Sequence, residues 1–159
     1  MYSLNAAVPA SVARLASGLA ADLLDATVRE RHTLVVKRLG DDEPGDLAET
    51  VRGVVAGTDP FPARVGGVET FRDPPSGTAP VAYLPVESPG LRRLHRQLCG
   101  RFGTIEDIEG DAYVPHVTVA RGGDADRLAG READVSWTVD RLHVWSGDYD
   151  EPVESIALP

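Results

Sequence analysis

Apolar residues recur along the chain at two different periods, one typical of helices and one typical of strands. Two segments carry apolar residues at relative positions 0, 3, 7 and 11, which places them in one stripe on a helix. The stripes are Val12, Leu15, Leu19 and Leu23, and Leu91, Leu94, Leu98 and Phe102. The pattern predicts helices at about 10–24, 45–56 and 89–102, with a short one near 124–131.

Alternating apolar and polar residues, bounded by proline and glycine, predict the strands. These lie at about 2–8, 32–39, 64–71, 79–87, 115–121, 135–146 and 153–158. Strands and helices are thus mixed along a chain of 159 residues, which is long enough to bury a core as one domain. The pattern predicts an α+β fold.

A strand–helix–strand unit occurs twice. Each striped helix follows a strand and begins near a proline, Pro9 or Pro89, a residue preferred at helix starts. Each is followed by a strand segment that opens with histidine, His32 or His116. We therefore expect an internal duplication with pseudo-twofold symmetry, in which the two histidines occupy equivalent places.

The segment YVPHVTVAR (113–121) joins this pattern to chemistry. In a regular strand His116 and Thr118 share one face, while Val117 and Val119 point to the core. An imidazole and a hydroxyl about 7 Å apart along a strand can contact one phosphate. If His32 faces His116, one imidazole can accept a proton while the other donates one, and no metal is needed. Threonine hydroxyls can bind the phosphate oxygens as charge develops.

These residues resemble the 2′-5′ RNA ligase/RNA 2′,3′-cyclic phosphodiesterase family of two-histidine phosphoesterases. HVTVAR (116–121) is similar to the second His-x-Thr motif of that family, and HTLVVKRLG (32–40) is similar to the first. The ending from Trp137 onward resembles the closing hairpin of the family. The resemblance implies a bilobal fold, residues 1–159 forming a single two-lobed domain, with two antiparallel-rich sheets flanking a central cleft and helices outside.

The resemblance also implies an activity. The family hydrolyses a 2′,3′-cyclic phosphate to a 2′-phosphate, and some members also join RNA ends reversibly through 2′-5′ bonds without a nucleotide cofactor. By analogy His32 is the acid for the leaving 3′ oxygen and His116 is the base for water. Thr118 and Thr33 are the candidate phosphate ligands, and Arg121 and Lys37 are further candidates for substrate binding.

The first motif departs from the family pattern, because threonine follows His32 directly and Leu34 stands where threonine is expected. Three arrangements remain open. A β-bulge could turn Thr33 inward beside His32; the threonine role could be lost; or Thr33 could occupy the usual histidine position, with His32 structural. Of the other histidines, His95 is expected on a helix surface, and His143 is expected to be exposed or hydrogen-bonded in the core.

Composition limits the setting in which the protein works. The net charge is −9, and Lys37 is the only lysine beside fifteen arginines, a pattern typical of halophilic proteins or of codon bias. The chain has one cysteine and no apolar run long enough to span a membrane. We expect a cytoplasmic monomer with no metal or cofactor.

Two alternatives to an RNA cyclic phosphodiesterase stay open. The substrate could be a small cyclic nucleotide or an ADP-ribose cyclic phosphate instead of RNA with a cyclic phosphate terminus. Alternatively, the protein could be a non-catalytic RNA- or nucleotide-binding module, which the displaced Thr33 would favour.

Overall fold

The structure, a computed structural model, describes residues 1–159 and contains three α-helices and ten strands. The helices are α1 (Ala10–Ala20), α2 (Pro44–Val55) and α3 (Pro89–Phe102), with single 3-10 turns η1 (Gly110–Ala112) and η2 (Ala125–Leu128). The strands are β1 (Tyr2–Ala6), β2 (Thr27–Val28), β3 (Leu34–Gly40), β4 (Phe61–Gly67), β5 (Glu69–Phe71), β6 (Val81–Glu87), β7 (His116–Arg121), β8 (Glu132–Val139), β9 (Arg141–Ser146) and β10 (Glu151–Ala157).

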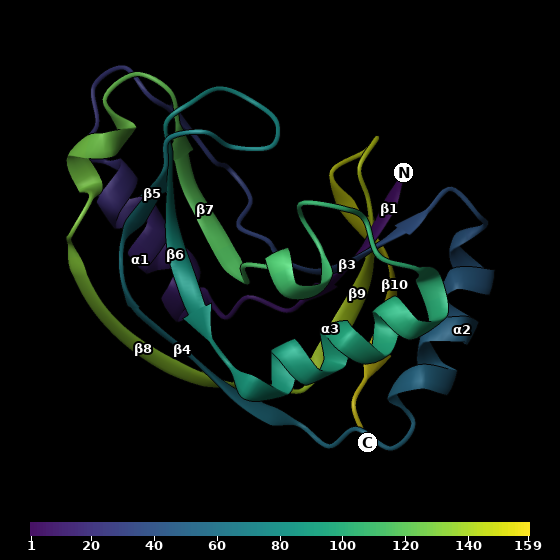
Figure 1. The fold of residues 1–159 in the computed structure, drawn as a ribbon. Coiled ribbons are helices and arrows are strands. Elements are labelled where there is room, and N and C mark those ends of the chain that lie inside the picture. The colour runs from purple at the N-terminus through teal and green to yellow at the C-terminus, as the bar shows by residue number, and fades with distance from the viewer.

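The strands form one curled sheet that divides into two lobes (Figure 1). Its order is β10-β9-β1-β3-β7-β6-β4-β8, and the pairings are antiparallel. The first four of these strands make one lobe, which also holds both chain termini, and the last four make the other. A single residue pair, Leu34 with Val117, joins the lobes through β3 and β7. The two sheets predicted from the sequence are therefore the two halves of one continuous sheet.

The order of strands confirms the predicted duplicated α+β fold. From the centre outward, each lobe has a strand that follows a striped helix (β3 or β7) and then the strand that precedes that helix (β1 or β6). Helix α1 packs against the opposite lobe, where it contacts β7 and β8, and α3 spans both lobes, contacting β3 of one and β4 of the other. These contacts tie the lobes together, and one cluster of 33 buried residues forms the core.

Several elements differ from the predicted boundaries. The helix predicted over 10–24 ends at Ala20, because the backbone N–H groups of Leu24, Asp25 and Ala26 bond to the carboxylate of Asp124 instead of continuing the helix. The strand predicted over 135–146 is broken at Asp140, where the chain leaves one lobe for the other.

Other features of the helices follow from local chemistry. The Ser88 hydroxyl accepts a hydrogen bond from the N–H of Leu91 and caps α3, with Pro89 as its first residue. The apolar stripe of α3 is fully buried at Leu91, Leu94 and Leu98. None of the helices has the length and apolarity that a membrane span requires.

Candidate functional site

The face of the sheet that carries the site is defined where the two lobes meet. Leu34 and Val117 are paired and wholly buried, so both point to the core. Side chains alternate along a strand, so their neighbours point to the opposite face. That face therefore receives His116 and Thr118 from β7, and Thr33 and Val35 from β3 and its approach.

A β-bulge in β7 brings Arg121 to the same face. Thr118 pairs with Tyr83 and Ala120 pairs with Ala82, which leaves Val119 without a partner in β6. Val119 and Ala120 are consequently both buried, and the next residue returns to the outer face. A regular strand would have pointed Arg121 away from His116.

A matching bulge lies in β3. Val35 pairs with Asn5 and Lys37 pairs with Leu4, which leaves Val36 without a partner in β1. Val36 and Lys37 are both buried as a result, and Arg38 takes the outer face. The two arginines thus reach the same face of the sheet by the same backbone device.

The two bulges place residues 33–40 and 116–123 in equivalent positions. In this correspondence TLVVKRLG matches HVTVARGG, so Thr33 is equivalent to His116 and Val35 is equivalent to Thr118. The shared Arg-x-Gly ending is the sequence signal that could have revealed it. Of the three arrangements left open for the first motif, the correspondence favours the one in which Thr33 occupies the histidine position.

His32 lies outside the cleft. It belongs to the segment 29–33, which loops between the pairs Val28–Ala120 and Leu34–Val117 and is not part of a strand. The imidazole is half-buried, and its Nε2 is covered without a hydrogen-bond partner. Burial and the nearby Arg29 lower the pKa of His32. The structure therefore does not bring His32 and His116 together in the cleft.

A cleft of about 310 Å³ lies over this face between two walls. His116, Arg121, Val35 and Arg38 contribute to it from the sheet. One wall is formed by the segment from Asp73 to Ser76, and the other by residues 107–114. Thr118 and Thr33 belong to the same face of the sheet but do not line this cavity. No cluster of three or more His, Cys, Asp or Glu side chains is placed to hold a metal ion.

The imidazole of His116 is held in one orientation. Its Nδ1–H donates to the carbonyl of Val114 at 2.7 Å, which leaves Nε2 as the proton-accepting nitrogen of the neutral ring. The rings of Phe71 and Tyr83 stack at 4.0 Å, and each packs edge-on to the imidazole at 5.5 Å. These aromatic neighbours were not anticipated from the sequence.

The electrostatic surroundings of His116 favour its neutral form. Burial is the main cause that lowers the pKa of His116, and the positive charges of Arg121, Arg38 and Arg29 lower it further. A hydrogen bond to Val114 opposes the effect in part. Three guanidinium groups therefore act on one imidazole in a protein whose net charge is −9. This local positive potential is suited to an anionic ligand.

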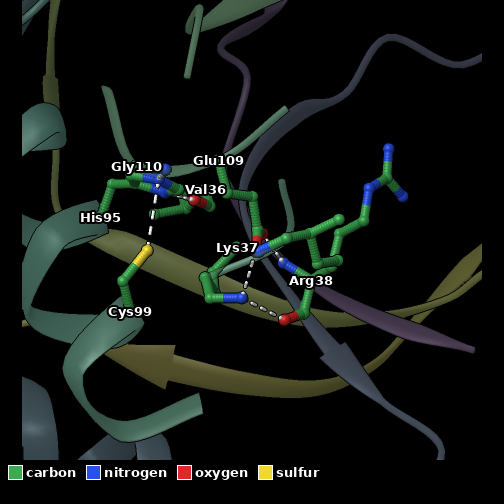
Figure 2. A network of polar contacts seen from close by, with 8 residues as sticks. Val36, Lys37, Arg38, His95, Cys99, Glu109 and Gly110 are labelled. Carbon is green, nitrogen blue, oxygen red and sulfur yellow. Dashed lines mark hydrogen bonds and ion pairs between the residues drawn. The ribbon is translucent and has the colours of Figure 1, made fainter. Parts of the chain in front are cut away.

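Lys37 is held in the interior and is not available to a ligand. It is 1% exposed, and its Nζ donates to Glu109 Oε1 at 2.7 Å and to the carbonyl of Arg38 at 2.8 Å (Figure 2). The prediction that Lys37 contacts substrate is therefore wrong. The next residue, Arg38, lines the cleft instead. The reason is the bulge at Val36, which turns the lysine to the core.

Glu109 ties the second wall of the cleft to β3. Burial alone would raise its pKa, but the hydrogen bonds from Lys37 and from the N–H groups of Arg38 and Ile105 outweigh it, so the pKa of Glu109 is lowered. The N–H donors lie 3.0 Å and 2.9 Å from its carboxylate oxygens. One ionised carboxylate thus fixes the wall segment against the strand that carries Arg38.

His95 also links the second wall of the cleft to β3. It is 1% exposed, so the prediction of a surface histidine is wrong. Its Nδ1–H donates to the carbonyl of Val36 at 2.6 Å, and its Nε2 accepts the N–H of Gly110 at 2.9 Å (Figure 2). Its ring also stacks on Tyr113 at 3.9 Å, and the Tyr113 hydroxyl donates to the carbonyl of Val35. His143 lies in β9, half-buried and away from the cleft.

Comparisons with known proteins agree with this architecture. A family model described as the 2′-5′ RNA ligase superfamily matches residues 32–151. No curated protein matches the chain. Among solved structures, TT0787 of Thermus thermophilus superposes with a TM-score of 0.64 at 20% identity, covering 99% of this chain and 97% of that one. E. coli LigT complexed with NADP+ superposes with a TM-score of 0.66 at 18% identity, covering 99% and 96%. E. coli LigT complexed with 3′-AMP gives 0.63 at 14% identity, again over 99% and 96%.

Proposed function

Because the chain belongs to the 2′-5′ RNA ligase superfamily, we propose that its cleft binds a nucleoside 2′,3′-cyclic phosphate and hydrolyses it to a 2′-phosphate. The observation that supports this best is the convergence of His116, Arg121 and Arg38 on one cleft, to which two equivalent bulges turn the arginines. The two LigT complexes compared above contain NADP+ and 3′-AMP, and this supports a nucleotide as the class of ligand.

In the proposed reaction His116 is the general base. Its Nε2 removes a proton from water, the resulting oxygen bonds to phosphorus, and the bond from phosphorus to the 3′ oxygen breaks. The imidazolium returns the proton through solvent to the 3′ oxygen, so the enzyme ends unchanged. The bound phosphate raises the proton affinity of His116 during this cycle, because a negative charge favours the imidazolium.

The remaining groups stabilise charge on the phosphate. The guanidiniums of Arg38 and Arg121 neutralise the non-bridging oxygens, and the Thr118 hydroxyl donates a hydrogen bond to one of them. His32 has no role in this scheme because it lies in the loop 29–33, and Thr33 takes the position equivalent to His116. A 2′-5′ ligation of RNA ends would use the same groups, with an RNA 5′-hydroxyl in place of water: its oxygen bonds to phosphorus as the bond from phosphorus to the 3′ oxygen breaks.

A second candidate function is nucleotide binding without turnover. The observation that favours it is Thr33, which stands at the position equivalent to His116, so the cleft has one imidazole where a two-histidine mechanism needs two. Arg38, Arg121 and Thr118 would still hold a phosphate in such a module.

Turnover of 2′,3′-cyclic AMP, followed by chromatography of the product, separates these functions. The wild-type protein should form 2′-AMP, and the His116→Ala variant should lose about 10²–10⁴-fold in turnover, the contribution of a general base. The matched control is His32→Ala, which should keep turnover within about threefold because this ring lies outside the cleft. Melting temperatures verify that both variants are folded.

Three results would change the proposal. A wild-type protein that binds 2′-AMP but forms no product would be a binding module. A His32→Ala loss as large as that of His116→Ala would restore the two-histidine mechanism. Unchanged turnover in His116→Ala would contradict the assignment of the base.

A further inference from the structure

The outer rim of the cleft is acidic, whereas its floor is basic. The rim is formed by the exposed side chains of Asp73, Glu106 and Asp107, beside Arg38. None of the three carboxylates forms an ion pair within the protein. Their charges are therefore not compensated by a cation of the protein at ion-pair distance.

The two walls of the cleft carry these carboxylates from separate parts of the chain. Asp73 belongs to the first wall, and Glu106 and Asp107 belong to the segment that Glu109 and His95 anchor to the core. Asp107 has a backbone φ of 70°, a conformation that Asp and Asn tolerate better than other side chains. The anchored wall thus holds two negative charges at the opening.

The size of the cleft suits one nucleotide. Its volume of about 310 Å³ lies at the lower end of the range found for small-ligand sites. Apolar walls at Phe71, Pro74 and Val114 can accommodate a base or sugar beside His116. A longer ligand that extends past Arg38 would pass over the acidic rim, which adjoins the cleft there.

A nucleic-acid chain meets an electrostatic barrier at that rim. Every nucleotide beyond the reacting one adds a negative phosphodiester, which proteins that bind RNA normally neutralise with Lys and Arg. Here the opening presents three carboxylates against the single guanidinium of Arg38, in a protein of net charge −9. A mononucleotide with a cyclic phosphate carries no charge beyond the group that the basic floor neutralises.

We propose that the substrate is a small nucleoside 2′,3′-cyclic phosphate and not the 3′ end of an RNA chain, and that Asp73, Glu106 and Asp107 exclude the longer polyanion. This inference rests on the proposed function, because it concerns the ligand of the same cleft. It assigns specificity to like-charge repulsion at the rim.

The test compares kcat/KM for 2′,3′-cyclic AMP and for an RNA of about ten nucleotides ending in a 2′,3′-cyclic phosphate, at about 50 and 500 mM KCl. The mononucleotide should be preferred at least about tenfold at low salt. The value for the RNA should rise with salt, because screening weakens repulsion. Ordinary binding of RNA to a basic surface weakens with salt. An increase of kcat/KM for the RNA with salt therefore indicates repulsion at the rim, and a decrease indicates attraction.

A charge-matched pair of variants tests the rim itself. Asp73→Asn/Glu106→Gln/Asp107→Asn removes the rim charges and keeps the shapes, with asparagine suited to the backbone at position 107. Asp42→Asn/Glu49→Gln/Asp59→Asn removes the same total charge from exposed residues that do not line the cleft. The rim variant should narrow the preference for the mononucleotide about tenfold, and the control should leave it nearly unchanged.

Other outcomes overturn the inference. These are a preference for the RNA, a value for the RNA that falls with salt, or equal effects of the two triple variants. If neither substrate is turned over, the proposed function fails. Binding of 2′-AMP, compared with an RNA ending in a 2′-phosphate, then decides the inference: tighter binding of 2′-AMP supports it, and equal, weaker or absent binding overturns it.

Discussion

Replacement of Glu109 by glutamine should destabilise the protein strongly, because it leaves the Lys37 ammonium buried without a counter-charge. The two side chains are 4% and 1% exposed, and they form a 2.7 Å ion pair. Glu109 also accepts the N–H groups of Arg38 and Ile105, which link the second wall of the cleft to β3. The substitution keeps the shape of the side chain and removes only its charge.

The magnitude follows from the burial of the pair. Breaking a buried ion pair by removing one partner costs about 3–5 kcal/mol in the free energy of unfolding. We expect a value near the lower end, about 3 kcal/mol, because the glutamine oxygen can still accept hydrogen bonds and Lys37 keeps the carbonyl of Arg38. In a protein of 159 residues this corresponds to a decrease of about 6–12 °C in melting temperature.

Urea unfolding monitored by circular dichroism measures the effect, with two comparison variants. Adding Lys37→Met to Glu109→Gln removes the unpaired charge and should recover at least about 1 kcal/mol. Glu154→Gln breaks the exposed pair with Arg52, whose atoms are 3.8 Å apart, and should cost less than about 1 kcal/mol.

The effect should also depend on pH. Because the pKa of Glu109 is lowered in the folded protein, the carboxylate contributes its full stability above its ordinary value of 4.5. That contribution is lost as the pH falls through the folded pKa, so the difference between wild type and Glu109→Gln should narrow in acid. A loss below about 1 kcal/mol at neutral pH, or no recovery in the double variant, would show that Glu109 does not stabilise the fold by pairing with Lys37.

Four further predictions concern the cleft and the surface. Thr33→His should raise turnover of 2′,3′-cyclic AMP by at least about tenfold, because it places a second imidazole opposite His116; no gain would contradict the equivalence of the two strands. Thr118→Val should cost about 2–3 kcal/mol of transition-state stabilisation, and Thr33→Val should cost less in the same assay. The acid limb of the profile of kcat/KM against pH should have its midpoint below 6.5, because the pKa of His116 is lowered, and a midpoint above that value would contradict its assignment as base. If the acidic surface is a halophilic adaptation, the melting temperature should rise into molar KCl, and a flat or falling value would favour codon bias.

The sequence alone was sufficient for the architecture and for one half of the site. The helical stripes, the alternation in the strands and the repeated strand–helix–strand unit predict a duplicated α+β fold, and the fold has this form. Alternation also predicts that His116 and Thr118 share a face. These features depend on local periodicity, which neighbouring residues specify by themselves.

The tertiary structure alone decided which basic groups enter the cleft. Whether Lys37 or Arg38 faces outward depends on how β3 pairs with β1, and the same holds for Arg121 in the pairing of β7 with β6. One extra residue in a strand moves all later side chains to the other face, and no local pattern reveals it. Lys37 can stay buried because Glu109, 72 residues later in the chain, reaches it. An ion of opposite charge brought by a distant segment makes the burial of that lysine tolerable, so its direction could be read only from the folded chain.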